Sequence, residues 1–425
     1  MPSLACIQSI GGPVKRSEAE PSLKQVMSSV MIAFTFPGQG SQAPGMGEPW
    51  RDHPSWELVA EASEASERDV EHLLLHADAE ELRQTRNSQL ATYVSSMIVL
   101  DAVERIGIEP AFHAGHSLGE YSALTAAGVL SFSAGVQLVT ERGNAMQAAA
   151  EETPGTMAAV LGLDDDLVDE ACRRVEGDVW VANYNAPGQV VIAGNADSIT
   201  EAGEIAKELG AKRVMPIKVG GAFHTPFMAP AQDRLQKSIA ETELRDANRP
   251  VFTNIDAGSH RAAADWADLL ATQLTSPVQW RRTLHALDQA GTTVFLELGP
   301  GTVLTGMVKR TLKGATKLGV NSPADVDGLL EQLSEAKKTG RVAEGELLYA
   351  VERLIVSPTT GVFEPAADLA VGSSIDRGQL VGAVGDTEVR SAFAGSLEGL
   401  LALTGERVTT SQPLAWLRAA SVGIP

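Results

Sequence analysis

The chain has 425 residues, 44% of them hydrophobic and 21% charged, which is enough sequence for about three domains with ordinary globular cores. A formal net charge of −20 argues against nucleic acid as a partner, since little basic surface could neutralise a phosphate backbone, and no apolar run reaches the length of a membrane span. The two cysteines, Cys6 and Cys172, have neither a metal-binding nor a redox spacing, so we expect a cytoplasmic protein without a disulfide framework or a metal site.

The first half of the chain alternates strand-like and helical segments. Residues 1–30 lack the apolar core of a signal peptide and are expected to form a mobile tail. A strand at 32–36 is followed by a glycine-rich turn, a helix is expected over 88–106, and a strand, a tight turn and a helix follow at 111–128. This alternation predicts an α/β domain with a mostly parallel sheet.

The segment 154–222 has a different order of elements. Its pattern is β-α-β-β-α-β, which is typical of a ferredoxin-like unit and suggests a small subdomain inserted in the larger one. We expect strands at 156–162, 179–185, 189–194 and 212–219, and helices at 164–175 and 198–210. The large domain resumes with strands near 250–255 and 293–298, which gives it the range 31–331, and polar text predicts a linker at 332–350 that has some helical character.

Residues 351–425 are rich in β-forming sequence and contain an internal repeat. The segments 372–384 and 405–417 align at a constant offset of 33, and 357–363 resembles 391–397 at an offset of 34. Two copies of a short-stranded unit predict a small pseudo-twofold all-β domain, because neither copy could bury its apolar face alone. Chance similarity in glycine-rich sequence is the alternative.

The most informative short motif is Gly115-His116-Ser117-Leu118-Gly119, which fits the Gly-x-Ser-x-Gly elbow of lipases, esterases and acyltransferases. Such an elbow exposes the serine hydroxyl between a strand and a helix, so Ser117 is a candidate nucleophile. A serine nucleophile needs a base. Among eight histidines, His224 is the best candidate, because Gly220-Gly221 and Pro226 bracket it in a rigid loop after a strand. These residues leave the substrate class open.

Seven blocks of the sequence, in their order along the chain, resemble the malonyl-CoA:acyl carrier protein transacylases over residues 31–325. The resemblance implies an α/β-hydrolase-like large subdomain with a ferredoxin-like insertion, and a role in fatty acid or polyketide synthesis. The blocks are FPGQGSQAPGMG (36–47), GHSLGEYSAL (115–124), Arg142 in TERGNAMQ, NAPGQVVIAG (185–194), GAFHTPFM (221–228), TQLTSPVQW (272–280) and LGPGTVLTGMVKR (298–310).

Matched to this family position by position, Ser117 is the acylated nucleophile and His224 its base. The resemblance implies a ping-pong transfer of malonyl from malonyl-CoA to the phosphopantetheine thiol of an acyl carrier protein, with no cofactor. The other matched positions are Gln39 and Leu118 for the oxyanion hole, Gln273 for a carbonyl that orients the histidine, Arg142 for the malonyl carboxylate, and Phe223 for selectivity toward unbranched malonyl. Without the family, Arg142 reads as a solvated helix residue.

The carrier protein of this family is acidic, so an acidic chain needs a local basic patch to dock it. The cluster of Lys309, Arg310, Lys313 and Lys317 is a candidate for this patch, and ordinary solvated helix charges are the alternative.

The C-terminal segment resembles the biotinyl/lipoyl carrier domain, which would make it a small barrel sandwich. That family carries its cofactor on a lysine in the hairpin between the two halves. Here the hairpin reads 384–388 as VGDTE, and no lysine follows Lys338. We therefore expect neither biotin nor lipoate to be attached, and we expect the domain to dock a protein partner.

Three alternatives remain open from the sequence. An esterase or lipase of the α/β-hydrolase fold would need a triad acid between serine and histidine, and it fits the ferredoxin-like insertion poorly. A trans-acting polyketide acyltransferase or acyl hydrolase would use the same nucleophile and base. A non-catalytic protein that only binds a carrier protein is opposed by the presence of Ser117, His224 and Arg142.

Overall fold

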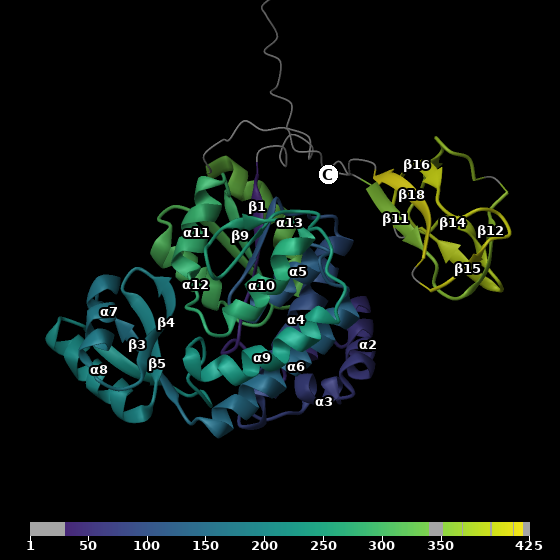
Figure 1. Cartoon of the computed structure of the whole chain (residues 1–425). Helices are drawn as coiled ribbons and strands as arrows, with labels where there is room; N and C mark the ends of the chain where they lie inside the picture. The colour runs from purple at the N-terminus through teal and green to yellow at the C-terminus, as the bar shows by residue number, and fades with distance from the viewer. Residues whose placement is uncertain (1–29, 340–351, 368, 392, 411, 420–425) are drawn as a thin grey trace, which may run out of the picture.

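The computed structural model describes residues 30–339 and 352–419, apart from 368, 392 and 411. The predicted tail, except for Val30, therefore lies outside the described residues, as do residues 340–351 of the predicted linker region and the last six residues. Figure 1 shows two structured parts, an α/β part and a smaller all-β unit at the C-terminal end of the chain.

A six-stranded sheet forms the centre of the α/β part. Its strand order is β10-β9-β1-β2-β7-β8, and every neighbouring pair is parallel except the antiparallel pair β7 and β8. The prediction of a mostly parallel sheet is confirmed. Continuous apolar runs such as residues 32–36, which are buried throughout, suit a sheet covered on both faces. The strands are β1 (Ile32–Phe36), β2 (Phe112–Gly115), β7 (Val251–Phe252), β8 (Ser259–His260), β9 (Val294–Leu298) and β10 (Thr316–Val320).

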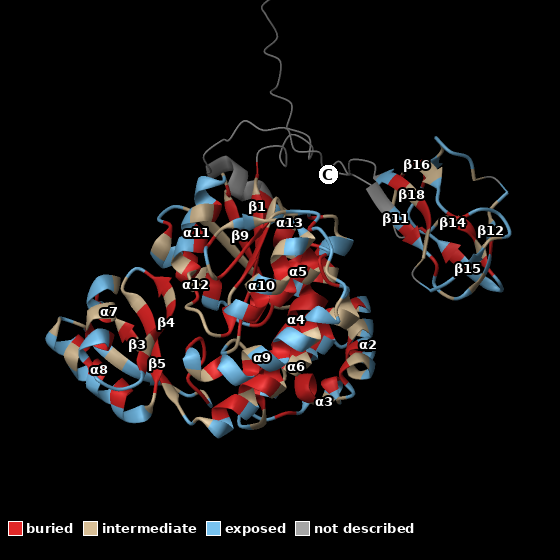
Figure 2. Ribbon diagram, in the orientation of Figure 1, coloured by how far each residue is buried: buried red, intermediate tan, exposed pale blue. Residues whose placement is uncertain are grey.

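Helices pack around this sheet and bury their apolar sides against it (Figure 2). The predicted helix at 88–106 runs from Thr85 to Arg105 and is buried along most of its length. None of the described helices is long and apolar enough to cross a membrane. The helices are α2 (Glu57–Ser66), α3 (Val70–Leu75), α4 (Thr85–Arg105), α5 (Gly119–Ala126), α6 (Phe132–Glu152), α9 (Ala229–Ala240), α10 (Ala263–Gln273), α11 (Trp280–Gln289), α12 (Val303–Thr311) and α13 (Pro323–Thr339), with short 3-10 turns η1 (Glu48–Trp50), η2 (Pro54–Trp56), η3 (Glu81–Arg83) and η4 (Pro226–Met228).

The segment between α6 and η4 forms a separate four-stranded antiparallel sheet with two helices. Its strand order, β4-β5-β3-β6, together with its β-α-β-β-α-β sequence order, is that of a ferredoxin-like unit. The sheet attaches to the rest through a backbone bridge between Asn183 and Val278 and through the ion pair of Asp165 and Arg281. The elements are β3 (Thr156–Leu161), α7 (Asp165–Arg174), β4 (Val179–Ala186), β5 (Gln189–Gly194), α8 (Ala196–Glu208) and β6 (Arg213–Ile217).

Helix α13 extends into the segment predicted as a linker. It continues through residues 332–339, and Leu333 is buried against the α/β part. The helical character predicted for this segment is therefore present in its described residues.

The C-terminal unit is built only of strands, in two four-stranded sheets. The sheet orders are β11-β18-β16-β13 and β15-β14-β12-β17, and buried side chains such as Phe363, Leu397 and Leu417 form its own core. The strands are β11 (Glu352–Val356), β12 (Gly361–Pro365), β13 (Ser374–Ile375), β14 (Leu380–Val384), β15 (Thr387–Arg390), β16 (Gly395–Leu400), β17 (Arg407–Val408) and β18 (Pro413–Ala419).

The internal repeat of this unit is visible in its hydrogen bonds. The Gln379 side chain accepts from the Asp376 N–H at 2.8 Å, and the Gln412 side chain accepts from the Thr409 N–H at 3.1 Å, 33 residues further on. Strands of one copy pair with strands of the other, since β13 pairs with β16 and β17 with β12. The two copies therefore complete each other's sheets. This agrees with the expectation that neither copy can bury its apolar face alone.

Candidate active site

Ser117 lies on a tight turn between strand β2 and helix α5, in the elbow that the motif predicts. Its backbone has a φ of 52°, in the left-handed region that side-chain-bearing residues rarely adopt. The two glycines are required by close backbone approach. A Cβ on Gly115 would lie 1.8 Å from the Gly119 carbonyl oxygen, and a Cβ on Gly119 would lie 2.1 Å from the Phe36 carbonyl oxygen. The hydroxyl is thereby lifted above the end of the sheet.

Asn254, just after strand β7, holds this turn in place. Its side-chain oxygen accepts from the Ser117 N–H at 2.6 Å, and its amide donates to the Gly115 carbonyl at 2.6 Å. The side chain is 1% exposed, so these bonds form away from water. One buried amide thus holds the backbone on the N-terminal side of the strained residue.

His224 lies directly beside Ser117. Its Nε2 is 2.7 Å from Ser117 Oγ, and its Nδ1 is 3.0 Å from the backbone carbonyl of Gln273. A carbonyl can only accept, so Nδ1 carries the proton and Nε2 is left as the acceptor for the serine hydroxyl. Burial, with the nearby Arg142 charge as a smaller cause, lowers the pKa of His224 to about 3, which keeps the ring neutral. Its φ of 61° is also left-handed.

Arg142, on helix α6, is fully buried behind the serine. It donates from Nη1 to the Gln89 side-chain oxygen at 2.7 Å and from Nη2 to Ser117 Oγ at 3.1 Å. The guanidinium also lies 5.4 Å from the centre of the Tyr121 ring, a favourable cation–π contact. Its Nε–H has no partner among the described residues. A buried guanidinium with a free donor beside the nucleophile can receive an acidic group.

Gln273, the last residue of α10, contributes more than its carbonyl. Its side-chain oxygen accepts from Arg142 Nη2 at 2.9 Å, and its amide donates to the Ser117 carbonyl at 3.0 Å and to the carboxylate of Glu120. The residue therefore contacts His224 through its backbone and Arg142 through its side chain. Burial raises the pKa of Glu120 to about 7, against the opposing effects of its hydrogen bonds and the Arg142 charge.

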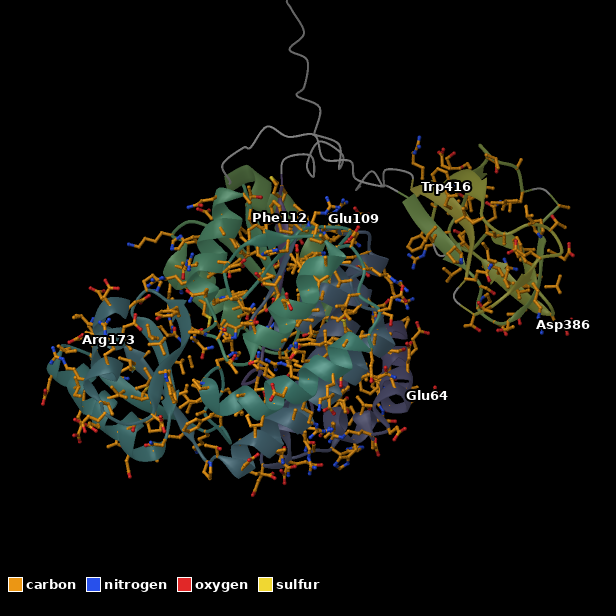
Figure 3. All side chains as sticks on the ribbon, viewed as in Figure 1. Glu64, Glu109, Phe112, Arg173, Asp386 and Trp416 are labelled. Carbon is orange, nitrogen blue, oxygen red and sulfur yellow. The ribbon has the colours of Figure 1, made fainter. Side chains whose placement is uncertain are left out.

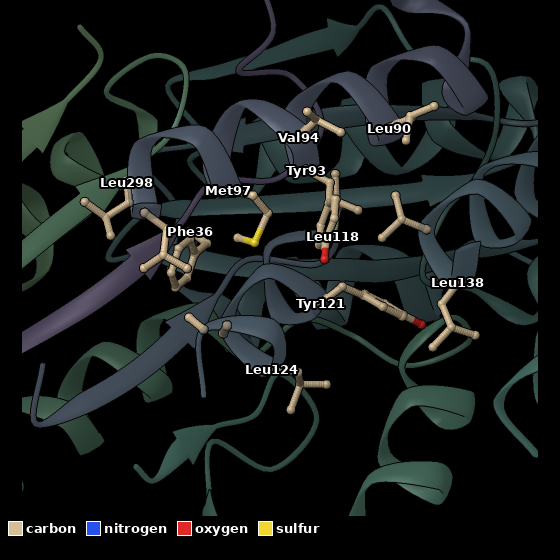
Figure 4. Close-up of a cluster of buried hydrophobic side chains, with 14 of the residues drawn as sticks. Phe36, Leu90, Tyr93, Val94, Met97, Leu118, Tyr121, Leu124, Leu138 and Leu298 are labelled. Atoms are coloured by element: carbon tan, nitrogen blue, oxygen red, sulfur yellow. The ribbon is translucent and has the colours of Figure 1, made fainter. Parts of the chain in front are cut away.

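The backbone around the serine offers unpaired donors. No hydrogen bond from the N–H of Gln39 or of Leu118 is present among the described residues. Leu118 precedes the first residue of α5, so its N–H lies at the positive end of that helix. Its side chain is buried in the core next to Tyr121 (Figure 4). Gly38, next to Gln39, packs so tightly on the His116 carbonyl that a Cβ there would be 2.4 Å from it.

A cavity of about 190 Å³ opens in front of the serine. Gln39, Ser117, Phe223 and His224 line it, whereas Arg142 lies behind Ser117 rather than on the cavity wall. The remaining wall is largely apolar and comes from both the large part and the ferredoxin-like unit, with Met146, Met157, Ile217, Val219 and Met307 among its residues. The ferredoxin-like unit thus supplies part of the cavity wall.

Comparison with known proteins identifies the family. The model of the acyl transferase domain matches residues 33–340. A curated malonyl CoA-acyl carrier protein transacylase from Bacillus subtilis is 42% identical over 309 residues, which cover 72% of this chain and 98% of that protein. The chain belongs to the malonyl CoA-acyl carrier protein transacylase family.

Solved structures of this transacylase family share the fold. An acyl carrier protein S-malonyltransferase from Vibrio cholerae matches with a TM-score of 0.68 and 39% identity, covering 70% of this chain and 99% of that one. A structure described as a type II PKS acyl-carrier protein in complex with its malonyl-transacylase matches with a TM-score of 0.68 and 37% identity, covering 71% and 99%. The α/β fold expected from the resemblance is confirmed.

Some residues of this transacylase site carried no signal in the sequence. Gln89 and Asn254 lie in no motif, and Glu120 has no assigned role although it lies within the block 115–124, yet these residues hold Arg142, Ser117 and Gln273 respectively. Glu120 directly follows the elbow glycine, so its position next to the nucleophile was available from the sequence. Gln89 and Asn254 are brought in only by the tertiary fold.

Helix α12 forms one side of the transacylase cavity and carries Lys309 and Arg310 of the predicted basic cluster, whereas Lys313 follows the helix and Lys317 lies on strand β10. Lys309, Arg310 and Lys313 are exposed, Lys317 is half-buried, and Arg310 is hydrogen-bonded to Gln189 of the ferredoxin-like unit. The start of α12 is fixed by Glu297, whose carboxylate accepts from the N–H groups of Leu304 and Thr305 at 3.0 and 2.7 Å.

Proposed function

We propose that this protein transfers a malonyl group from malonyl-CoA to the phosphopantetheine thiol of an acyl carrier protein, through a malonyl-serine intermediate on Ser117. The single observation that carries the proposal is the convergence of a neutral histidine and a buried arginine on one serine hydroxyl, at 2.7 and 3.1 Å. The histidine supports acyl transfer in general, and the arginine favours an acyl group with a carboxylate of its own.

The first half-reaction follows from the hydrogen bonds of Ser117. The hydroxyl donates to His224 Nε2, so its proton passes to the histidine as the oxygen attacks the thioester carbonyl. Negative charge then develops on the carbonyl oxygen, and the unpaired N–H groups of Gln39 and Leu118 are placed to stabilise it. His224 returns the proton to the departing CoA thiol.

The second half-reaction uses the same groups in the opposite direction. His224 takes the proton of the incoming carrier-protein thiol, the thiolate attacks the malonyl ester, and Ser117 leaves with the proton returned to it. The backbone carbonyl of Gln273 holds the ring orientation throughout, in the role that a triad acid fills in related hydrolases. The proton moves only between Ser117, His224 and the thiol, so the transfers need no third ionisable group.

Specificity is assigned to Arg142 and Phe223. A monocarboxylic acyl group would leave the buried Arg142 charge unpaired, whereas the malonyl carboxylate can form a charge-assisted pair with it. Phe223 is buried at the cavity wall, where its ring restricts room for a branched malonyl group. The role of Phe223 is assigned from the family resemblance.

For the second substrate, we keep the basic cluster of Lys309, Arg310, Lys313 and Lys317 as the docking patch for an acidic carrier protein. Lys309 and Arg310 lie on the helix that forms one side of the cavity, so a partner bound there would have its pantetheine arm close to Ser117. The spacing of the cysteines supports a cytoplasmic site of action. The pathway that the reaction serves is fatty acid or polyketide synthesis.

For the C-terminal unit, we propose a biotinyl/lipoyl-like barrel sandwich that has lost its cofactor and serves to dock a protein partner. The hairpin of β14 and β15 turns through Gly385 and Asp386, with Val384 paired to Thr387, and carries no lysine. Asp386 projects at the outer edge of the unit in Figure 3. The repeat-related pairing of its strands supports the fold assignment.

Intact mass spectrometry tests both proposals on one sample. Incubation with malonyl-CoA is expected to add one malonyl group to the wild-type chain and none to Ser117→Ala, because that variant has no nucleophile. Labelling that persists in Ser117→Ala would refute the assignment of the nucleophile. The untreated protein is expected to have the mass of its sequence, and a biotin or lipoyl addition would refute the proposal for the C-terminal unit.

A further inference from the structure

The side chain of Gln273 connects a buried positive charge to a buried acid. Its oxygen accepts from Arg142 Nη2 at 2.9 Å, and its amide group donates to the carboxylate of Glu120. Both ends are removed from water, since Arg142 is 0% and Glu120 1% exposed. The three side chains come from three different helices, α6, α10 and α5, so this arrangement exists only in the folded chain.

No carboxylate pairs directly with Arg142 among the described residues. Glu120 is the acid that hydrogen bonds link to Arg142, with the side-chain amide of Gln273 between the two. A buried charge without a partner of opposite sign is costly. The protonation state of Glu120 therefore depends on whether another negative charge lies next to Arg142.

The other ionisable groups around Glu120 do not replace this coupling. Asp256, in the loop after β7, adds negative charge, and Tyr121 is neutral because burial and Glu120 itself raise its pKa. His224, on the other side of Gln273, is kept neutral by burial. Arg142 is therefore the cation that favours the ionised form of Glu120, while burial raises the pKa of this carboxyl to about 7.

We infer that Glu120 takes up a proton from solvent when the acyl carboxylate of the substrate pairs with Arg142, so that the site holds one carboxylate charge in both states. The inference rests on the proposed malonyl substrate and adds a residue that governs its recognition without touching it. A second carboxylate at one guanidinium would leave an unpaired negative charge in a low-dielectric interior. Protonation of Glu120 removes that charge and keeps an oxygen to accept from Gln273.

This role separates Glu120 from a residue that merely positions Gln273. A structural acceptor would act equally for every acyl group and at every pH. A proton-accepting Glu120 acts only when the ligand carries a carboxylate, and it makes the binding of that ligand weaker as pH rises above its pKa.

The test measures protons bound along with the ligand. Ser117→Ala prevents acyl transfer, and calorimetric titration at pH 7.5 in two buffers of different ionisation enthalpy gives the proton uptake for malonyl-CoA and for CoA. CoA is the matched control because it carries the same phosphates without the carboxylate. We expect malonyl-CoA to take up as much as roughly 0.75 of a proton more than CoA, the ionised fraction of a group with a pKa of about 7.

The variant Glu120→Gln, made in the Ser117→Ala chain, keeps an acceptor oxygen but cannot titrate. It is expected to abolish the difference between the two ligands. Equal uptake for malonyl-CoA and CoA in the Ser117→Ala chain, or a difference that survives in Glu120→Gln, would overturn the inference.

A second measurement decides the matter if Glu120→Gln does not fold. Between pH 6.5 and 8.5 the affinity of the Ser117→Ala chain for malonyl-CoA, relative to CoA, is expected to fall by up to roughly 20-fold. A pH-independent ratio contradicts the inference. Failure of the proposed function is distinguishable, because in that case the wild-type chain forms no malonyl adduct, whereas failure of this inference alone leaves the adduct intact.

Discussion

Asn254 lies outside the motif and holds the backbone at Ser117 through two hydrogen bonds. A non-glycine residue in the left-handed region costs about 1–2 kcal/mol, and the two bonds of the Asn254 side chain offset that cost at Ser117. The turn is therefore held by an interaction with another strand end rather than by its own sequence.

Removing that side chain is expected to reduce both activity and stability. Asn254→Ala leaves the Ser117 N–H and the Gly115 carbonyl without partners, which should lower the free energy of unfolding by about 1–3 kcal/mol. The rate of malonyl-serine formation should fall roughly 100-fold as the hydroxyl loses its position beside His224. Urea unfolding and single-turnover mass spectrometry measure the two effects, and a variant that acylates at the wild-type rate would contradict this role.

Arg142 gives a prediction about substrate choice. Arg142→Ala removes the proposed partner of the acyl carboxylate, so transfer of malonyl should fall by roughly 100-fold or more, while acetyl transfer gains relative to it. Competition between malonyl-CoA and acetyl-CoA, read as the mass of the acyl-enzyme, measures the ratio. Arg142→Lys is the matched control, because it keeps the charge but loses the planar fork. An unchanged preference in Arg142→Ala would exclude the carboxylate clamp.

At the scale of single residues the sequence marks the candidate nucleophile and base, but not the residues that support them. Ser117 is marked by its two glycines and His224 by its bracketed loop, and the structure places them in hydrogen-bond contact. Asn254 and Gln89 are ordinary amides in the sequence, and only the packing of β7 and α4 brings them to the site. Their roles depend on contacts across 137 and 53 residues of chain, which no local pattern records.

Among the elements, α12 shows how a buried acid can position a helix. The carboxylate of Glu297, at the end of β9, accepts from three groups of the first turn, including the Thr305 hydroxyl at 2.6 Å. It compensates the unpaired N–H groups and the positive end of the helix dipole from outside the helix. The cavity residues Leu304 and Met307 depend on this placement.

Glu297→Ala is expected to lower the free energy of unfolding by about 1–3 kcal/mol, because one buried and two part-buried donors lose their acceptor. It should also raise the KM for malonyl-CoA severalfold, because α12 moves relative to the cavity. Glu297→Gln keeps an acceptor oxygen and is expected to lie between the wild-type chain and Glu297→Ala in both measurements. Wild-type stability in Glu297→Ala would rule out this anchoring role.

The order of the elements could largely be predicted, because each has a local pattern. The ferredoxin-like order, the parallel sheet and the repeat of the C-terminal unit follow from alternation, turns and offsets in the sequence. Their mutual contacts could not, since the bridge of Asn183 to Val278 and the pair of Asp165 with Arg281 join segments about a hundred residues apart. The cavity wall shared by the two units was therefore absent from the prediction.

For the molecule as a whole, the family resemblance ends where the C-terminal unit begins. The matched part of this chain is 72% of its length, yet it covers 98% of the Bacillus subtilis transacylase. The matching domain ends at residue 340. A chain truncated after Thr339 contains every residue of the site and the helix α13 that packs on the sheet. It is expected to form the malonyl-serine intermediate within about twofold of the full-length rate.

Circular dichroism provides the control that the truncated chain is folded. A folded truncated chain that fails to acylate would show that the C-terminal unit contributes to the reaction itself. A loss confined to transfer onto the carrier protein would instead agree with its proposed docking role.

The backbone angles at residues 117 and 224 bear on how this protein could evolve. Both residues have positive φ, where glycine is free of steric strain, so the serine and the histidine each carry a backbone cost of about 1–2 kcal/mol that glycine would not. The backbone conformation alone would thus favour glycine at both positions. Continued turnover is the pressure that keeps a serine and a histidine at these two places.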